Sequence, residues 1–150
     1  MNTKLGCLFG LMMVASVGGC GGGSTTTSNN NNNTTYTCNA NLTASTSTYV
    51  VSGSSLTLTT GGQTVTLTRL SAGSSTAEPI YGGWQLPSSD SNVLDLTAVG
   101  SLDIEPGKVT VSTICSALGH NPTTATATSA ATITDTTLVI QQNESDTESF

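Results

Sequence analysis

Short runs that alternate between apolar and hydroxyl side chains constrain this chain more than any other feature of its sequence. In residues 64–70, TVTLTRL, Val65 and Leu67 fall on one face, with Arg69 as a third candidate, and three threonines fall on the other. A period of two is typical of a half-buried β-strand, and threonine favours strands over helices. Because no window shows a convincing helical period, the chain is expected to be all-β.

Nine such runs follow one another from the middle of the chain to near its end. They cover residues 47–53, 55–60, 64–70, 81–86, 92–99, 100–105, 108–115, 124–133 and 137–142. Turn residues separate them, among them Gly61-Gly62, Pro106-Gly107 and Thr134-Asp135. Many short strands bounded by turns predict a small antiparallel barrel or sandwich of about eight or nine strands.

The first twenty residues have the pattern of an export signal. Lys4 precedes an uncharged run from Leu5 to Val17, which is shorter than the roughly 20 residues of a membrane-spanning helix. The next residues, Val17-Gly18-Gly19-Cys20, resemble the lipobox of bacterial lipoproteins. The resemblance implies that residues 1–19 are removed and that Cys20 carries the lipid, with acyl chains such as palmitate. The alternative is an ordinary secretory signal in which the cysteine is a coincidence.

The resemblance also suggests a location. In bacterial lipoproteins an Asp after the lipidated cysteine favours the inner membrane, whereas this chain has Gly21. We therefore expect a lipid-anchored protein of the bacterial cell envelope, in the outer membrane rather than the inner one.

Composition divides the exported part into three segments. Residues 20–37 comprise Cys20 and a Gly/Ser/Thr/Asn tract, which is expected to be a flexible linker because it has little apolar surface to bury. Residues 38–143 are the expected all-β domain. Residues 144–150 are expected to be an acidic, solvated tail or an unfinished strand.

Two cysteines remain in the exported domain, Cys38 and Cys115, and in an oxidising compartment a disulfide between them is the default. In the chain-entropy model, closing a loop of about 78 residues contributes roughly 4.5 kcal/mol of stability. The alternatives are two free thiols or a metal pair, but one histidine and two distant cysteines make a poor zinc set. No metal and no cofactor is expected.

Charge and motifs argue against nucleic-acid binding and against catalysis. The chain has nine acidic residues and three basic ones, of which Lys4 lies in the predicted signal, so its surface would repel phosphates. Asp103 and Glu105 alternate with Leu102 and Ile104, which predicts the wet face of a strand, with Glu105 near Lys108 across a turn. His120 lies in the loop-forming sequence GHNP, and no nucleophile elbow surrounds Ser116. The chain is not expected to be an enzyme.

One short motif gives a further resemblance. Gly82-x-Trp84 resembles the Gly-x-Trp of lipocalins and lipocalin-like β-barrels, in which a basic residue of the last strand packs on the tryptophan that closes the barrel. Arg69 is the candidate for that pair, as a cation over the Trp84 ring. Arg69 precedes Trp84, the reverse of the family order, so the resemblance allows a circular permutation, a junction of two partial repeats, or no relationship. The alternative is that Trp84 only fills the core.

These observations predict a non-catalytic, lipid-anchored envelope lipoprotein. The first hypothesis is a small binding module that takes an apolar ligand, as lipocalin-like barrels do, or an envelope protein as its partner. The alternative is a structural or adhesive surface lipoprotein without a ligand pocket. The membrane is contacted through the N-terminal lipid, and no nucleic acid is expected as a partner.

Overall fold

Eight antiparallel strands form a closed barrel. The computed structural model describes residues 24–28, 34–73, 78–87, 89–91, 96–117 and 119–149, among which there is no helix. The barrel strands are β3 (Ser45–Ser52), β4 (Ser55–Thr60), β5 (Gln63–Ala72), β6 (Gly82–Gln85), β8 (Leu96–Glu105), β9 (Lys108–Ser116), β10 (Thr123–Ile133) and β11 (Thr137–Ile140). Each pairs with the next barrel strand along the chain, and β11 pairs with β3. The expected all-β fold is thus confirmed, and of the two predicted architectures, barrel and sandwich, the structure has the barrel.

The hairpin turns lie where the sequence predicts them. Gly61 and Gly62, between β4 and β5, have φ angles of 55° and 82°. Positive φ at both central residues is the mark of a type I′ turn, whose twist matches that of the two strands. Pro106-Gly107 joins β8 to β9, and Thr134-Asp135 lies between β10 and β11. These turns allow consecutive strands to pair as neighbours.

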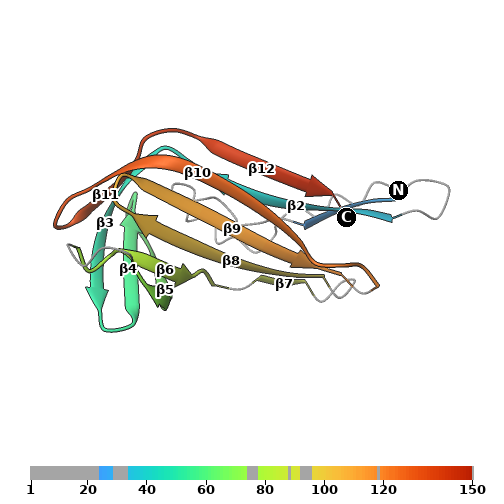
Figure 1. Cartoon of the computed structure of the whole chain (residues 1–150), viewed down its shortest axis with the longest axis horizontal. Helices are drawn as coiled ribbons and strands as arrows, with labels where there is room; N and C mark the ends of the chain where they lie inside the picture. The colour runs from blue at the N-terminus through green and yellow to red at the C-terminus, as the bar shows by residue number, and fades with distance from the viewer. Residues whose placement is uncertain are drawn as a thin grey trace.

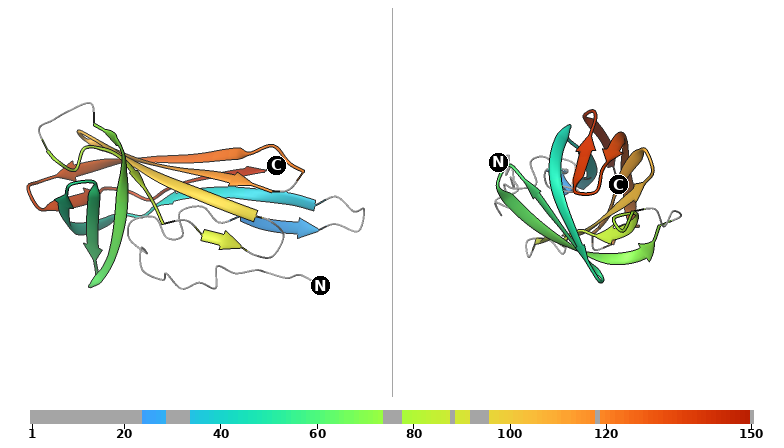
Figure 2. Two further views of the ribbon diagram at one scale, coloured as in Figure 1. Left: turned by 90° about the horizontal axis from the view of Figure 1, so that it is seen from below. Right: turned by 90° about the vertical axis from the view of Figure 1, so that its left-hand side faces the viewer.

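The molecule is longer than its barrel. β8, β9 and β10 continue beyond the barrel into an extension, where β7 (Ser89–Ser91) pairs with β8 (Figure 1). A second sheet of β1 (Ser24–Ser28), β2 (Thr34–Leu42) and β12 (Glu144–Ser149) packs through β2 and β12 against this extension. Figure 2 shows the molecule from below and from the end at which the barrel lies.

Some predicted boundaries differ from the structure. β1 and the first residues of β2 fall within the expected linker, 20–37, and β12 falls within the expected tail, 144–150. The expected strands 92–99 and 100–105 are one strand, β8, from Leu96, while 92–95 lie outside the described residues. Gly100, where the second of these expected strands would begin, lies inside β8, and the Leu86 side chain would be 2.8 Å from a Cβ added there. The predicted signal and Cys20 lie outside the described residues.

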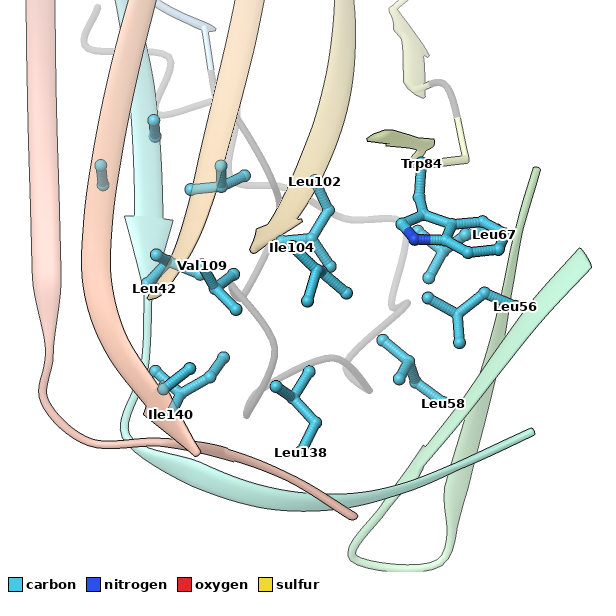
Figure 3. Packing of buried hydrophobic residues seen from close by; sticks show 14 of the residues in the cluster. Leu42, Leu56, Leu58, Leu67, Trp84, Leu102, Ile104, Val109, Leu138 and Ile140 are labelled. Carbon is cyan, nitrogen blue, oxygen red and sulfur yellow. The ribbon is translucent and has the colours of Figure 1, made fainter. Parts of the chain in front are cut away.

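Apolar side chains from all eight barrel strands point inward and fill the barrel. The largest fully buried ones are Trp84, Leu56, Leu58, Leu67, Leu102, Ile104, Leu138, Ile140, Val109 and Val111 (Figure 3). They are joined by Ile80 of the β5–β6 connection and Leu42 of β2. β3 contributes Tyr49 and β10 contributes Ala131. Because successive side chains of a strand point to opposite faces, the intervening threonines lie on the outer surface.

Candidate functional site

The predicted pair of Arg69 and Trp84 is present at the junction of β5 and β6. The two residues are cross-strand partners, and the Arg69 guanidinium carbon lies 4.1 Å from the centre of the Trp84 ring. Trp84 is fully buried, and its indole N–H donates to the carbonyl oxygen of Ile80 at 2.8 Å. The predicted cation over the Trp84 ring is thus observed, and Trp84 is also part of the hydrophobic core.

Arg69 has a second role that the sequence did not reveal. Its guanidinium donates to the carbonyl oxygens of Tyr81, at 3.1 Å, and of Pro79, at 2.7 Å. Together with the Trp84 bond to Ile80, these contacts hold residues 79–81 against the barrel. Ile80, in the middle of this segment, is fully buried among the core side chains. The site therefore fastens the β5–β6 connection to the barrel.

Three glycines let the backbones of this site approach closely. A Cβ on Gly82, which has a φ of +130°, would lie 2.4 Å from the Ser71 carbonyl oxygen, and one on Gly73 would lie 2.7 Å from Tyr81. A Cβ on Gly83 would lie 2.7 Å from the Ser71 hydroxyl. The β5–β6 ladder shifts register between Arg69 and Ser71, as in a β-bulge. The first glycine of the Gly-x-Trp motif thus has a steric reason.

Tyr49 of β3 lies close to the same connection, near Glu78 and Tyr81. Its hydroxyl donates to the carbonyl oxygen of Thr134 at 2.7 Å, in the β10–β11 turn. Its amide donates to the carbonyl oxygen of Thr136 at 2.9 Å. Burial raises the pKa of Tyr49, and the nearby carboxylates of Glu78 and Asp135 raise it further. The phenol is therefore held neutral as a hydrogen-bond donor.

One groove in the described part of the chain lies outside the barrel interior. It is open, has a volume of about 390 Å³, and is lined by Asn41, Leu42, Thr43, Asn143, Glu144 and Ser145. Two of them end β2, two begin β12, and Thr43 and Asn143 lie in the adjoining connections. Small-molecule sites enclose most of their ligand, whereas this groove is widely open to solvent.

The predicted disulfide between Cys38 and Cys115 is present. It joins β2 to β9, both cysteines are fully buried, and their Cα atoms are 5.7 Å apart. Neither sulfur is therefore available as a nucleophile or as a metal ligand. Nearby, the hydroxyl of fully buried Thr113 has no hydrogen-bond partner among the described residues.

The remaining charged candidates lie on the surface. Asp103 is exposed, Glu105 is half-buried, and the Glu105 carboxylate lies 2.7 Å from the Lys108 amine. His120 lies exposed in the connection between β9 and β10, outside the Arg69–Trp84 site. Within the described ranges, no three His, Cys, Asp or Glu residues are grouped closely enough to hold a metal ion. The described part of the chain also contains no helix that is long and apolar enough to span a membrane.

Comparison of the chain with family models, with curated proteins and with solved structures gives no match. Its function is therefore argued from the site and the fold. Sequence reasoning identified Arg69, Trp84 and both cysteines, but it missed Tyr49, Ile80 and the carbonyl oxygens that Arg69 binds. The extended run that contains Tyr49 was visible, yet its partner, Thr134, is far away in the sequence.

Proposed function

We propose that this chain is a non-catalytic lipoprotein of the bacterial cell envelope, anchored through lipid on Cys20, which binds an envelope protein with its outer surface. The observation that supports outer-surface binding is the filled barrel. Large apolar side chains from β4, β5, β6, β8, β9 and β11 occupy the space that a lipocalin-like barrel would offer to a ligand. This favours an envelope protein over an apolar small ligand as the partner.

The anchor is supported by the lipobox-like sequence and by the chain's course. Ser24, the first described residue, is only four residues after Cys20, and at about 3.3–3.6 Å per residue that distance is at most about 14 Å. Ser24 pairs with Cys38 of β2, in the second sheet, which packs against the extension. The lipid would therefore hold the extension near the membrane, and the barrel would lie farther from the attachment point.

The filled barrel equally suits the structural alternative, a surface lipoprotein without a ligand pocket. Its outer face consists largely of threonine and serine, with cross-strand hydroxyl pairs such as Thr110 with Thr128, at 2.9 Å. Partner binding and a structural role differ in whether a specific complex forms.

Three experiments test the proposal. Cys20→Ala should move the protein from the membrane fraction to the soluble fraction, and a variant that stays with the membrane would contradict lipid anchoring. The melting temperature of the purified chain should not change with fatty acids, and a clear rise would show that the barrel admits an apolar ligand.

Site-specific photo-crosslinking in cells at exposed Thr66 should give one discrete protein adduct, whereas no adduct from several exposed threonines would favour the structural alternative.

A further inference from the structure

One side of β10 lacks a partner strand over most of its length. β9 pairs with β10 from Thr123 to Ala130, whereas β11 pairs with it only from Ala131 to Ile133. The carbonyl oxygen of Ala130 accepts the N–H of Gln141 at 2.9 Å, but from Thr123 to Ser129 no described strand forms a ladder on the side of β10 that faces away from β9. Unpaired main-chain groups of this kind are a template for pairing with another chain.

The sequence of β10 offers nothing that would reject such a partner. Its eleven residues, TTATATSAATI, include no charge, no glycine and no proline. Thr124, Thr126 and Thr128 are exposed, while Ala125 and Ala127 are buried, so the strand has a regular alternation. Segments with high β-propensity and no charge or proline are those that associate edge to edge.

β12 lies beside this open side without forming a ladder with it (Figure 1). The contact is made by side chains instead. The Asp146 carboxylate accepts the main-chain N–H of Thr126 at 2.9 Å through one oxygen, and the N–H of Thr147 at 2.9 Å through the other. Nearer the barrel, the buried Ser129 hydroxyl donates to the carbonyl oxygen of Gln142 at 3.1 Å.

The charge of β12 has no counterpart on the chain. Glu144, Asp146 and Glu148 alternate along the strand. The two basic residues outside the predicted signal are used elsewhere, Arg69 on Trp84 and Lys108 with Glu105. Two copies that approached through this side of β10 would bring their carboxylates together. Inward-pointing charges at a sheet edge are a known means of preventing strand pairing.

We infer that Asp146 blocks the edge of β10. Its carboxylate accepts the hydrogen bond of the Thr126 N–H and so prevents β10 from pairing with β10 of a second copy of this chain. The occupant that it excludes is a second copy, because the uncharged, alternating sequence of β10 is compatible with itself in an antiparallel pair. This inference does not depend on the lipid anchor or on the proposed partner.

The test compares two substitutions on β12 in the full chain with Cys20→Ala. Asp146→Ala removes the blocking carboxylate, whereas Glu148→Ala removes the same charge from an exposed position of the same strand. Light scattering after size-exclusion chromatography should show Asp146→Ala rising from one to two chains per particle with concentration. Glu148→Ala should remain monomeric. A monomeric Asp146→Ala at every concentration, or equal association of both variants, would overturn the inference.

A second substitution identifies the edge. Thr126→Pro removes the N–H that donates to Asp146, and proline is tolerated at such an edge because that N–H belongs to no ladder. The double variant Asp146→Ala/Thr126→Pro should return to a monomer, and a persistent dimer would show that another surface associates.

Hydrogen exchange in the chain with Cys20→Ala alone tests the hydrogen bond between Thr126 and Asp146 without a substitution in β12. The amide of Thr126 should exchange more slowly than that of Thr124 on the same side of β10, because Asp146 accepts the former. Equal exchange of the two amides would contradict the inference, whether or not the Asp146→Ala variant folds.

Discussion

At the scale of single residues, the barrel depends on a few polar side chains that bind main-chain carbonyl oxygens. Arg69 binds two such oxygens, Trp84 binds one, and Tyr49 binds one across the β10–β11 turn. A buried or half-buried donor without a partner would cost free energy, so each side chain specifies where its loop must lie. The sequence indicated the Arg69–Trp84 contact through a motif, but no motif indicates which carbonyl oxygens lie nearby.

Substitution of Arg69 tests this arrangement. Arg69→Ala loses two charge-assisted hydrogen bonds and the contact with the Trp84 ring, so we expect the free energy of unfolding to fall by about 2 kcal/mol. Arg69→Lys should lose less, since it keeps the cation but not the planar fork. Urea denaturation followed by Trp84 fluorescence measures both. Lys108→Ala, which removes an exposed cation, is the control, and an equal loss there would mean that charge alone is responsible.

The alkaline limb of the stability profile tests Tyr49. Its pKa is raised by burial and by Glu78 and Asp135, so the neutral phenol is favoured in the folded state. That stability is fully present below the ordinary tyrosine pKa of about 10 and is lost as pH rises through the higher folded pKa. Tyr49→Phe should lower stability by about 1 kcal/mol at neutral pH through loss of the bond to Thr134, and should flatten the alkaline decline.

The control for this profile is Tyr81→Phe, a half-buried tyrosine of the neighbouring loop. Unfolding free energies of both variants are compared across neutral and alkaline pH. If Tyr49→Phe retains the full alkaline decline of the unsubstituted chain, the cause lies in another group.

At the scale of elements, alternation decided which face of each strand is buried. Val65 and Leu67 of β5 are buried, and Asp103 of β8 is exposed between buried Leu102 and Ile104, as the period of two predicts. Alternation could not find β1, β7 or β12, because these strands are short and polar and exist through main-chain pairing with a neighbour. Nor could it show that Gly100 lies inside a strand, since that depends on its pairing with Thr113 of β9.

Among the described glycines, Gly82 has the least room for a side chain. Gly82→Ala would place a Cβ 2.4 Å from the Ser71 carbonyl oxygen at a φ of +130°, so the start of β6 would have to move away from β5. We expect a loss of at least about 2–3 kcal/mol, measured by urea denaturation, together with a changed near-UV signal from Trp84. Gly62→Ala is the control, since its φ is also positive but its Cβ would meet no atom within 4 Å. Equal losses in the two variants would leave crowding without a measurable role.

At the scale of the whole molecule, two long-range links define the shape. The pairing of β11 with β3 closes the barrel, and the disulfide of Cys38 with Cys115 attaches the sheet of β2 to the extension. In a closed barrel every strand has a neighbour on both sides, wherever the chain begins. Arg69 and Trp84 can therefore lie on neighbouring strands although their order along the chain is the reverse of that in lipocalin-like barrels. Their relationship to lipocalin-like barrels stays a prediction.

The disulfide should be important for stability because the chain is small and it joins distant strands. Replacing both cysteines by alanine should lower the free energy of unfolding by about 2–5 kcal/mol, mainly by giving the unfolded chain more freedom. The measurement is guanidinium denaturation of the double variant against the oxidised chain. The control is the unsubstituted chain denatured in the presence of a reductant. Its free energy of unfolding should approach that of the double variant. A midpoint unchanged by the double substitution would contradict this role.

The sequence by itself determined the all-β class, the hairpin turns, the inward face of most strands and the two cysteines available to pair, because these follow from local side-chain chemistry. Only the tertiary structure decided that the sheet closes, that its interior is filled, that Arg69 fastens residues 79–81 and that β12 lies beside β10. Each of these depends on contacts between residues brought together by folding, whose partners a local pattern does not specify.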